Sequence, residues 1–144
     1  MKKLPKILLI EDNEGDAELV KEALGNRQLK SEILVIDDGE EAINFLNGSG
    51  KYKGEAPPNL IVLDVNLPKV DGKEILMFVK NNPNLKKIPV VIFTTSSLQS
   101  DIDFAYSNHA NCYIVKSGDL SEFKKVISAL EDFWVHSVTY ANIN

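Results

Sequence analysis

Five short apolar runs recur along the chain, and each is followed by a segment with helical spacing. The runs are KILLI at 6–10, EILVI at 32–36, LIVL at 60–63, PVVIF at 89–93 and CYIV at 112–115. Several are apolar at consecutive positions rather than at alternate ones, which is typical of strands buried on both faces. They predict five strands at the centre of the protein.

The segments between these runs carry signals for the start of a helix. Helices are expected after Asn13, Asp38, Asp71 and Asp119. A further helix, which is the fourth in chain order, is expected around 98–107. Each of the three aspartates has a glutamate three residues later, which is the spacing of a capping box. The fourth helix aligns Leu98, Ile102, Ala105 and Tyr106. The last helix carries an apolar stripe that we expect mostly to face the core, formed by Phe123, Val126, Ile127, Leu130, Phe133 and Trp134. Trp134 lies late enough in this helix to protrude.

Strand and helix alternate five times, which predicts an α/β fold with a parallel sheet covered on both faces. Right-handed crossovers make the sheet doubly wound, and we expect the strand order 2-1-3-4-5. One domain over 1–144 is expected, with its core at about 6–134. The stretch 47–59 is rich in Gly, Pro and polar residues and predicts an exposed loop, while 135–144 either extends the last helix or frays.

Composition and charge narrow the function classes. The 144 residues are 44% apolar and 26% charged, an ordinary soluble composition, and the net charge is −5. An acidic chain argues against nucleic acid as a partner, because phosphate binding needs a basic face. Cys112 is the single cysteine, so no intramolecular disulfide forms and it is expected to be a small buried packing residue. His109 and His136 lack metal-ligand spacing and are expected at the surface.

We expect neither a signal peptide nor a membrane span. Two lysines precede the first apolar run, but Pro5 interrupts this segment and Glu11 and Asp12 end it. No window approaches the roughly 20 apolar residues that a membrane span needs. We therefore expect a cytoplasmic protein.

Acidic residues follow two of the predicted strands at the point where each strand ends. Glu11 and Asp12 follow the first strand, and Asp64 follows the third. In the order 2-1-3-4-5 these two strands flank the switch point, where open α/β sheets bind their ligands. Three converging carboxylates repel one another, and a bound divalent cation would neutralise their negative charge. Oxygen ligands with retained water suit Mg²⁺ or Mn²⁺ and do not suit zinc.

The fourth and fifth strands are followed by groups that complement these acids. Thr94 and Thr95 come just past the fourth strand, and Lys116 comes just past the fifth. A carboxylate nucleophile, a bound metal, a hydroxyl and a lysine form the set that phosphoryl transfer to a carboxylate needs. The metal and Lys116 would neutralise phosphoryl oxygens, Thr94 would donate a hydrogen bond, and Asn66 would offer its backbone carbonyl to the metal.

At these residues the sequence resembles the receiver domains of two-component response regulators, whose fold is flavodoxin-like. The resemblance covers about Lys6 to Trp134 and rests on LLIEDN, LIVLDVNLPKVDG, PVVIFTTS and NCYIVKS. It implies that Asp64 is the phosphoacceptor, that Asp12 binds Mg²⁺ directly and Glu11 binds it through water, and that Thr94 and Tyr113 form a switch pair. It also implies a sensor histidine kinase as the phosphoryl donor.

A narrower resemblance concerns stand-alone receivers that serve bacterial phytochrome-type sensor kinases. It rests on IEDNEGDAELVKEAL, on the long loop into PPNLIVLDVNLP, on NCYIVKS and on the late Phe-Trp pair. One position departs from the family pattern, because Ser117 follows Lys116 where receivers usually have proline, often after a cis bond. A cis bond before a non-proline residue costs roughly 3 kcal/mol, so a trans bond with a shifted turn and a strained cis bond are both open.

These residues are compatible with three functions to different degrees. The first is a non-enzymatic phosphorylation switch that contacts a downstream protein through the fourth helix, fifth strand and fifth helix; this face could also support a homodimer. The second is a phosphatase with an aspartyl-phosphate intermediate, but Asn66 stands where such an enzyme needs an acid, and no cap insertion is evident. The third, a binding module that has lost phosphorylation, conflicts with the intact acids. Nucleotide binding lacks its glycine-rich motifs.

Overall fold

A parallel sheet of five strands forms the centre of the protein. The computed structural model describes residues 4–24 and 32–143. The strand order is β2-β1-β3-β4-β5, which confirms the predicted order. The strands are β1 (Lys6–Ile10), β2 (Glu32–Ile36), β3 (Leu60–Leu63), β4 (Val90–Thr94) and β5 (Cys112–Val115). The fourth strand thus runs one residue later than expected and includes Thr94, which was placed just beyond its end.

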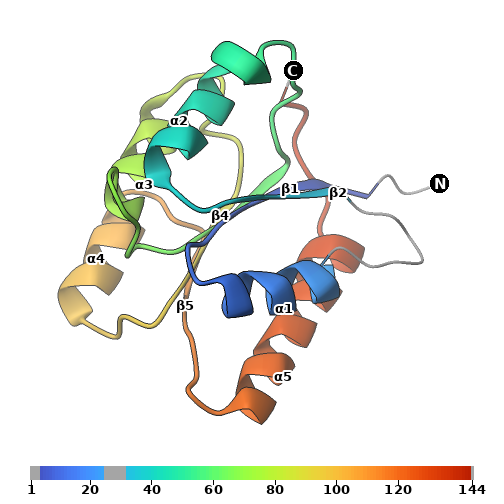
Figure 1. Ribbon diagram of the computed structural model, residues 1–144, viewed down its shortest axis with the longest axis vertical. Coiled ribbons are helices and arrows are strands. Elements are labelled where there is room, and N and C mark those ends of the chain that lie inside the picture. Colours follow the sequence, from blue (N-terminus) through green and yellow to red (C-terminus); the bar gives the residue numbers. More distant parts are fainter. Residues whose placement is uncertain (1–3, 25–31, 144) are drawn as a thin grey trace.

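Helices cover both faces of this sheet. Figure 1 shows α1 and α5 together on one side and α2, α3 and α4 on the other. The helices are α1 (Glu14–Leu24), α2 (Gly39–Asn47), α3 (Gly72–Asn81), α4 (Gln99–Ser107) and α5 (Leu120–Leu130), with a short 3₁₀ helix η1 (Gly50–Tyr52) and a π-helical segment η2 (Glu131–Ser137). The predicted doubly wound α/β architecture is therefore confirmed.

Alternate residues of the central strands supply the cores on the two sides of the sheet. In β1, Leu8 and Ile10 pack on the side of α2 and α3, whereas Ile7 and Leu9 pack on the side of α1 and α5. All four are buried, as are the residues of β3 and β4, which explains why these runs are apolar at every position. The edge strands β2 and β5 are only partly buried.

The predicted aspartate caps are present at three helices. The side chains of Asp38, Asp71 and Asp119 accept hydrogen bonds from backbone N–H groups three residues later, at 2.8, 3.1 and 3.0 Å. At α2 the second half of the capping box is replaced by another contact. The Glu41 carboxylate accepts from the Tyr52 hydroxyl at 2.5 Å and thereby ties η1 to α2.

Helix α4 leaves much of its apolar stripe open to solvent. Leu98 precedes the helix as its N-cap residue, and of the four aligned residues only Ala105 is buried. Leu98 and Tyr106 are 64% and 49% exposed. The predicted helix is confirmed, and its stripe is covered at Ala105 and exposed at its two ends.

The end of the last helix also differs from the expectation. The α-helix gives way to π-helical geometry from Glu131, in which hydrogen bonds join residues five apart. The wider turn rotates the following side chains, so Val135 is buried while Phe133 is 55% exposed and Trp134 is half-buried. The expected core position was therefore wrong for Phe133, which protrudes, whereas Trp134 is partly covered.

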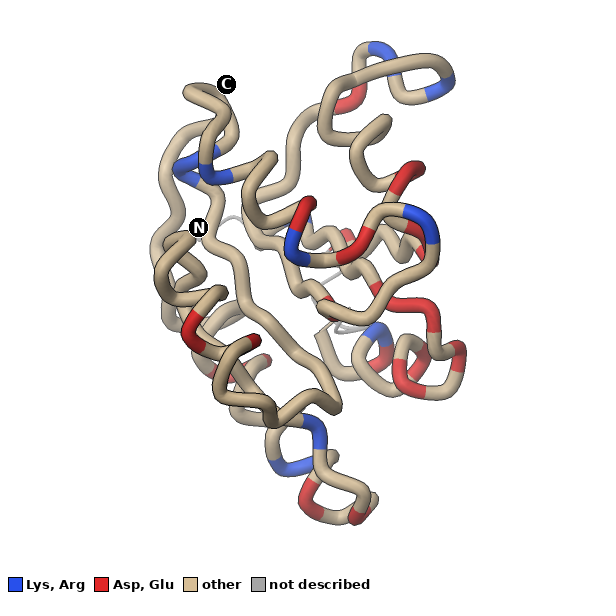
Figure 2. Tube along the Cα trace, turned by 90° about the vertical axis from the view of Figure 1, so that its left-hand side faces the viewer, with Lys and Arg blue, Asp and Glu red and all other residues tan. Residues whose placement is uncertain are grey.

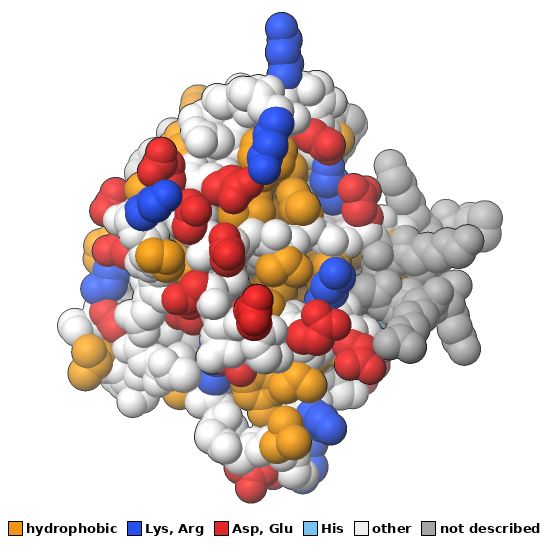
Figure 3. Space-filling view, viewed as in Figure 1, with side chains coloured by type: hydrophobic (Ala, Val, Ile, Leu, Met, Phe, Trp, Pro, Cys, Tyr) orange, Lys and Arg blue, Asp and Glu red, His pale blue; other side chains and the backbone are white. Residues whose placement is uncertain are grey.

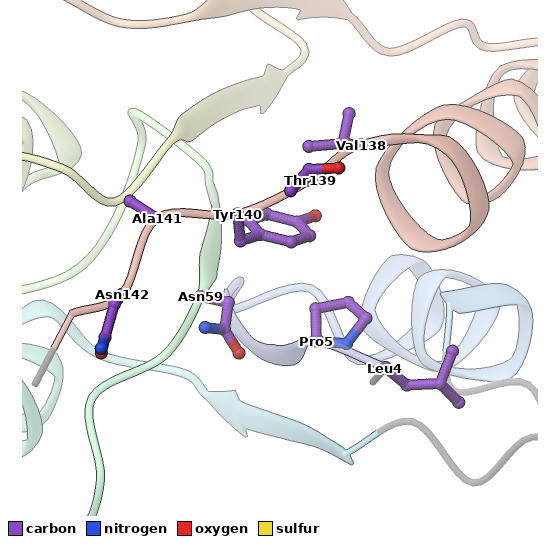
Figure 4. Close-up of a pocket in the computed structure, with 8 residues that line it drawn as sticks. All are labelled: Leu4, Pro5, Asn59, Val138, Thr139, Tyr140, Ala141 and Asn142. Carbon is purple, nitrogen blue, oxygen red and sulfur yellow. The ribbon is translucent and has the colours of Figure 1, made fainter. Parts of the chain in front are cut away.

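Beyond η2 the chain crosses the end of the sheet where the strands begin. Tyr140 packs with the core cluster on the α1 and α5 side, and Ile143 packs with the cluster on the opposite side. The Tyr140 hydroxyl donates to the backbone carbonyl of Trp134. A hollow of about 440 Å³ lies between this segment and the start of β1, lined by Pro5, Asn59, Tyr140 and their neighbours (Figure 4).

Within residues 4–24 and 32–143, none of the helices combines the length and apolar character needed to cross a bilayer.

Candidate functional site

The site forms where β1 and β3 lie side by side and end together. Ile10 pairs with Leu63, so the residues that follow them leave the sheet as neighbours. The backbone N–H of Asp64 donates to the carbonyl of Ile10 at 3.1 Å. As a result one carboxylate oxygen from each of Glu11, Asp12 and Asp64 lies within 4.8 Å of the others. The structure thus brings together the three acids that the sequence singled out.

The three carboxylates have different surroundings. Glu11 is 2% exposed and Asp64 is 6% exposed, whereas Asp12 is open to solvent. Burial raises the pKa of Glu11 to about 7, and the charge of Asp64 adds to this effect. The hydrogen bond from Lys116 opposes both. Glu11 therefore has a carboxylate whose ionisation at neutral pH depends on a nearby positive charge.

Lys116 supplies such a charge from the loop after β5. Its ammonium group contacts Glu11, Asp16 at 2.9 Å and Asp64 at 3.2 Å, and its side chain is 3% exposed. Burial lowers its pKa, but the hydrogen bonds with Glu11 and Asp16 outweigh burial and leave the pKa above its ordinary value. The described residues contain no cis peptide bond, so the bond from Lys116 to Ser117 is trans.

The donor set fits a hard divalent cation. Four acids, Glu11, Asp12, Asp16 and Asp64, gather at this site with one lysine, which leaves an excess of negative charge around Asp64. All the candidate ligands are oxygens and Asp12 leaves one side open, an arrangement that suits Mg²⁺ or Mn²⁺ with retained water. Glu11, Asp12 and Asp64 would hold the ion. The backbone N–H of Asn66 donates to Asp64 Oδ1 at 3.0 Å, so this residue lies beside the three acids. Its backbone carbonyl stays the further predicted ligand of the metal.

Thr94 and Tyr113 meet through the loop between β4 and α4. Thr94 is fully buried at the end of β4, and its Oγ1 accepts a hydrogen bond from Ser96 N at 3.4 Å. The Tyr113 hydroxyl donates to the Ser96 carbonyl at 2.9 Å. Burial raises the pKa of Tyr113, so this hydroxyl stays a donor at neutral pH. The two predicted switch residues are therefore linked through Ser96.

Several residues around the site were not found from the sequence. Asp16 lies in the first turn of α1, and the hydrogen bond from its N–H to Asn13 Oδ1 at 2.9 Å helps to set that turn. Its signal was its place in the first turn after the acidic pair, on the helix that starts at the switch point. Lys73 and Asp101 form an ion pair of 2.6 Å beside the site, and their spacing in the sequence gives no hint of it.

The histidines and the cysteine lie outside this site. His109 is exposed, with a φ of 69°, and His136 is exposed on η2 within 3.5 Å of Glu131. Cys112 is half-buried at the start of β5 and packs beside the core on the α1 and α5 side. The expected packing role is confirmed, although Cys112 is only partly buried because β5 is an edge strand.

Charge is distributed over the whole molecule as well as at the site. Acidic positions occur along many parts of the trace, with lysines between them (Figure 2). Acidic side chains also spread across the middle of the face shown in Figure 3, and basic ones are scattered among them. The site is thus a local concentration of acid on an acidic protein.

Comparison with known proteins agrees with this geometry. The sequence profile of the response regulator receiver domain matches residues 7–128. The response regulator Rcp1 of Synechocystis sp. (strain ATCC 27184 / PCC 6803 / Kazusa) is 44% identical over 133 residues, which cover 92% of this chain and 90% of that protein.

Two solved structures are similar over nearly their whole length. The phosphorylated cyanobacterial phytochrome response regulator RcpA has a TM-score of 0.93 and 42% identity, covering 97% of this chain and 100% of that one. The Mn²⁺-bound form of Rcp1 has a TM-score of 0.92 and 43% identity, covering 96% and 99%. The resemblance seen in the sequence motifs is confirmed: the chain belongs to the response regulator receiver domain family.

Proposed function

We propose that this protein is a phosphorylation-dependent signalling switch that accepts a phosphoryl group on Asp64. One observation carries the proposal: the Asp64 carboxylate lies at the end of β3 with two further acids within 4.8 Å and the Lys116 ammonium at 3.2 Å. This arrangement offers a nucleophile, a place for a divalent cation and a fixed positive charge in one pocket.

The chemical step is a transfer between two nucleophiles. A carboxylate oxygen of Asp64 attacks the phosphorus of a phosphohistidine or an acyl phosphate and forms a new P–O bond. The bond from phosphorus to the donor breaks, and its electron pair stays with the donor. A Mg²⁺ ion held by Glu11, Asp12 and Asp64 supplies charge neutralisation when bound. Lys116 neutralises a second phosphoryl oxygen, and the Thr94 hydroxyl donates a hydrogen bond to a third.

We propose a sensor histidine kinase of the phytochrome type as the donor, and a cytoplasmic location to match. The support is the likeness to RcpA, which is a phytochrome response regulator whose solved form is phosphorylated. The likeness extends over nearly the whole of both chains and includes the segments that surround Asp64.

Output then passes through protein contact at the face of α4, β5 and α5. Three large apolar side chains on this face are exposed, namely Leu98 (64%), Tyr106 (49%) and Val115 (41%). Tyr106 also accepts a hydrogen bond from the backbone N–H of Tyr113, so the exposed face is joined to the switch tyrosine. A downstream protein or a second copy of the chain would bury these side chains.

The test is incubation with Mg²⁺ and acetyl phosphate, followed by intact mass. Wild type is expected to gain one phosphoryl group, and Asp64→Asn and wild type in EDTA are expected to gain none. Asp103→Asn, an exposed acid on α4, is the matched control and should behave as wild type. Phosphorylation of Asp64→Asn at the wild-type rate would refute the proposal.

A turnover assay separates the switch from a phosphatase. With a generic phosphomonoester and Mg²⁺, we expect no multiple turnover, because Asn66 provides no acid beside Asp64 to protonate a leaving group. The phosphorylated protein is expected to lose its phosphoryl group slowly to water.

A further inference from the structure

Ser96, in the loop between β4 and α4, engages all three of its polar groups. Its N–H donates to Thr94 Oγ1 at 3.4 Å, and its carbonyl accepts from the Tyr113 hydroxyl at 2.9 Å. Its own hydroxyl donates to Asp101 Oδ2 at 2.5 Å. The position of Asp101 therefore fixes the residue that joins Thr94 to Tyr113.

Asp101 is in turn held from another helix. Its Oδ1 lies 2.6 Å from the Lys73 ammonium, so its two oxygens are shared between α3 and the loop. The Asp101 side chain is 12% exposed, which shields the contact from solvent more than an ordinary surface pair. Lys73 is also fixed by the Phe104 ring, whose centroid lies 5.2 Å from its ammonium group.

This ion pair lies at the rim of the acidic site. Lys73 and Asp101 line the same hollow as Asp12 and Asn66, with a volume of about 530 Å³. Figure 1 shows α3 and α4 as neighbours on one side of the sheet, so the pair bridges the helices that follow β3 and β4. A contact between these helices can therefore act on the loop that carries Thr94.

We propose that Lys73 and Asp101 are positioning residues whose ion pair holds the loop between β4 and α4, and with it keeps Tyr113 on the Ser96 carbonyl. The part of this inference that concerns phosphorylation rests on the proposed function of Asp64. With Ser96 fixed, a lone pair of the Thr94 hydroxyl is taken by Ser96 N–H. The Thr94 proton is then free to point at an incoming phosphoryl oxygen.

The first test follows Tyr113 in the unphosphorylated protein. The four tyrosines are replaced by 3-fluorotyrosine, and Tyr113→Phe assigns the Tyr113 fluorine resonance. Lys73→Met and Asp101→Asn are each expected to shift this resonance in the same direction, because either change breaks the same contact. Lys73→Arg keeps the charge and should retain the wild-type position. Resonances of Lys73→Met and Asp101→Asn that coincide with wild type would overturn the proposal.

The second test uses the double variant and a matched control. If one contact carries the effect, Lys73→Met/Asp101→Asn should shift the resonance no further than either single variant. Shifts that add would mean that the two residues act separately, and would overturn the proposal. Lys125→Met loses an exposed ion pair with Glu122 on α5 and should leave Tyr113 unchanged.

The third readout is the rate of phosphate uptake from acetyl phosphate. We expect Lys73→Met and Asp101→Asn to be about twofold to fivefold slower than wild type, the range that one partly shielded ion pair spans. Wild-type protein that takes up no phosphate would refute the proposed function. The Tyr113 resonance would still test whether the ion pair positions Tyr113. A normal wild-type rate with an unmoved resonance in both variants would refute the ion-pair proposal alone.

Discussion

A methyl group placed on Gly72 would lie 2.3 Å from the backbone carbonyl oxygen of Asp64 and 2.5 Å from the Cα of Val65. The first residue of α3 therefore packs against the backbone that leaves β3, at a distance that a larger residue does not allow. The N–H of Gly72 also donates to the Val65 carbonyl at 3.1 Å. The start of α3 thus constrains the backbone that carries the Asp64 carboxylate.

Gly72→Ala is expected to damage the site as well as the fold. The added carbon meets backbone rather than a movable side chain, so the cost should be about 1–3 kcal/mol of unfolding free energy. The displaced Asp64 should also take up phosphate from acetyl phosphate more slowly. Urea unfolding and intact mass measure the two effects.

Gly118→Ala is the control for this substitution. A Cβ at Gly118 would meet no atom within 4 Å, and its backbone is not in the left-handed region. We expect a change within about 0.5 kcal/mol, as for most surface substitutions. Equal effects at Gly72 and Gly118 would show that the close contact with Asp64 does not matter.

The parts of the fold that could be predicted are those with local or topological causes. Asp38, Asp71 and Asp119 cap their helices by contacting the backbone N–H three positions later, a spacing that is visible in the sequence. The convergence of Glu11 and Asp64 follows from strand order, because strands of one parallel sheet end at one edge. Neither inference needs the position of any other side chain.

The parts that escaped prediction depend on rotation and on distant partners. Whether Phe133 or Val135 faces the core is decided by the π-helical turn at Glu131, which the apolar spacing does not reveal. The contact of Asp16 with Lys116 spans a hundred residues and depends on how the first turn of α1 faces the sheet. The spacing of apolar residues in α4 does not distinguish a stripe that faces solvent from one that faces the core.

Lys116→Met is expected to separate metal binding from phosphorylation. Removing this ammonium takes a positive charge away from Asp64 at 3.2 Å, so at an alkaline pH where Glu11 is ionised in both proteins the remaining acids should bind Mg²⁺ about fivefold tighter or more. Phosphate uptake should fall, because a phosphoryl oxygen loses its partner. Calorimetric titration with Mg²⁺ and intact mass after acetyl phosphate check the two directions.

The matched variant for this prediction is Lys125→Met, which removes an exposed lysine on α5. It should change neither Mg²⁺ affinity nor phosphate uptake. If Lys116→Met binds Mg²⁺ more weakly than wild type at this alkaline pH, the lysine and the metal do not compete for the same carboxylates.

Tyr140→Ala should destabilise the protein without affecting the site. Its ring lies 6.5 Å from that of Trp134 and its hydroxyl bonds the Trp134 carbonyl, so truncation should cost about 1–3 kcal/mol. Tyr140→Phe loses the hydrogen bond alone, at about 1 kcal/mol. Urea unfolding followed by Trp134 fluorescence measures both. Phosphate uptake should stay at the wild-type rate, because Tyr140 lies where the strands begin and Asp64 lies where they end.

Glu11 is expected to make both stability and metal binding depend on pH. Its pKa rises from an ordinary 4.5 to about 7 in the folded protein because of burial and the neighbouring Asp64. Between these values the folded state binds more protons at Glu11 than the unfolded state. The Glu11 contribution to stability without metal should therefore fall as pH rises from 4.5 to about 7. Urea unfolding with EDTA across this range should show a decline that Glu11→Gln lacks.

Mg²⁺ binding should have the opposite dependence, because the ion needs the ionised carboxylate. Below the pKa of Glu11 each bound ion should release up to one proton, so affinity should fall by about tenfold per pH unit at most. Titration calorimetry in two buffers of different ionisation heat measures the protons released. Glu122→Gln, at an exposed glutamate on α5, should release as many protons as wild type, and Glu11→Gln should release fewer. Equal release from wild type and Glu11→Gln would mean that the carboxylate of Glu11 is already ionised before the metal arrives.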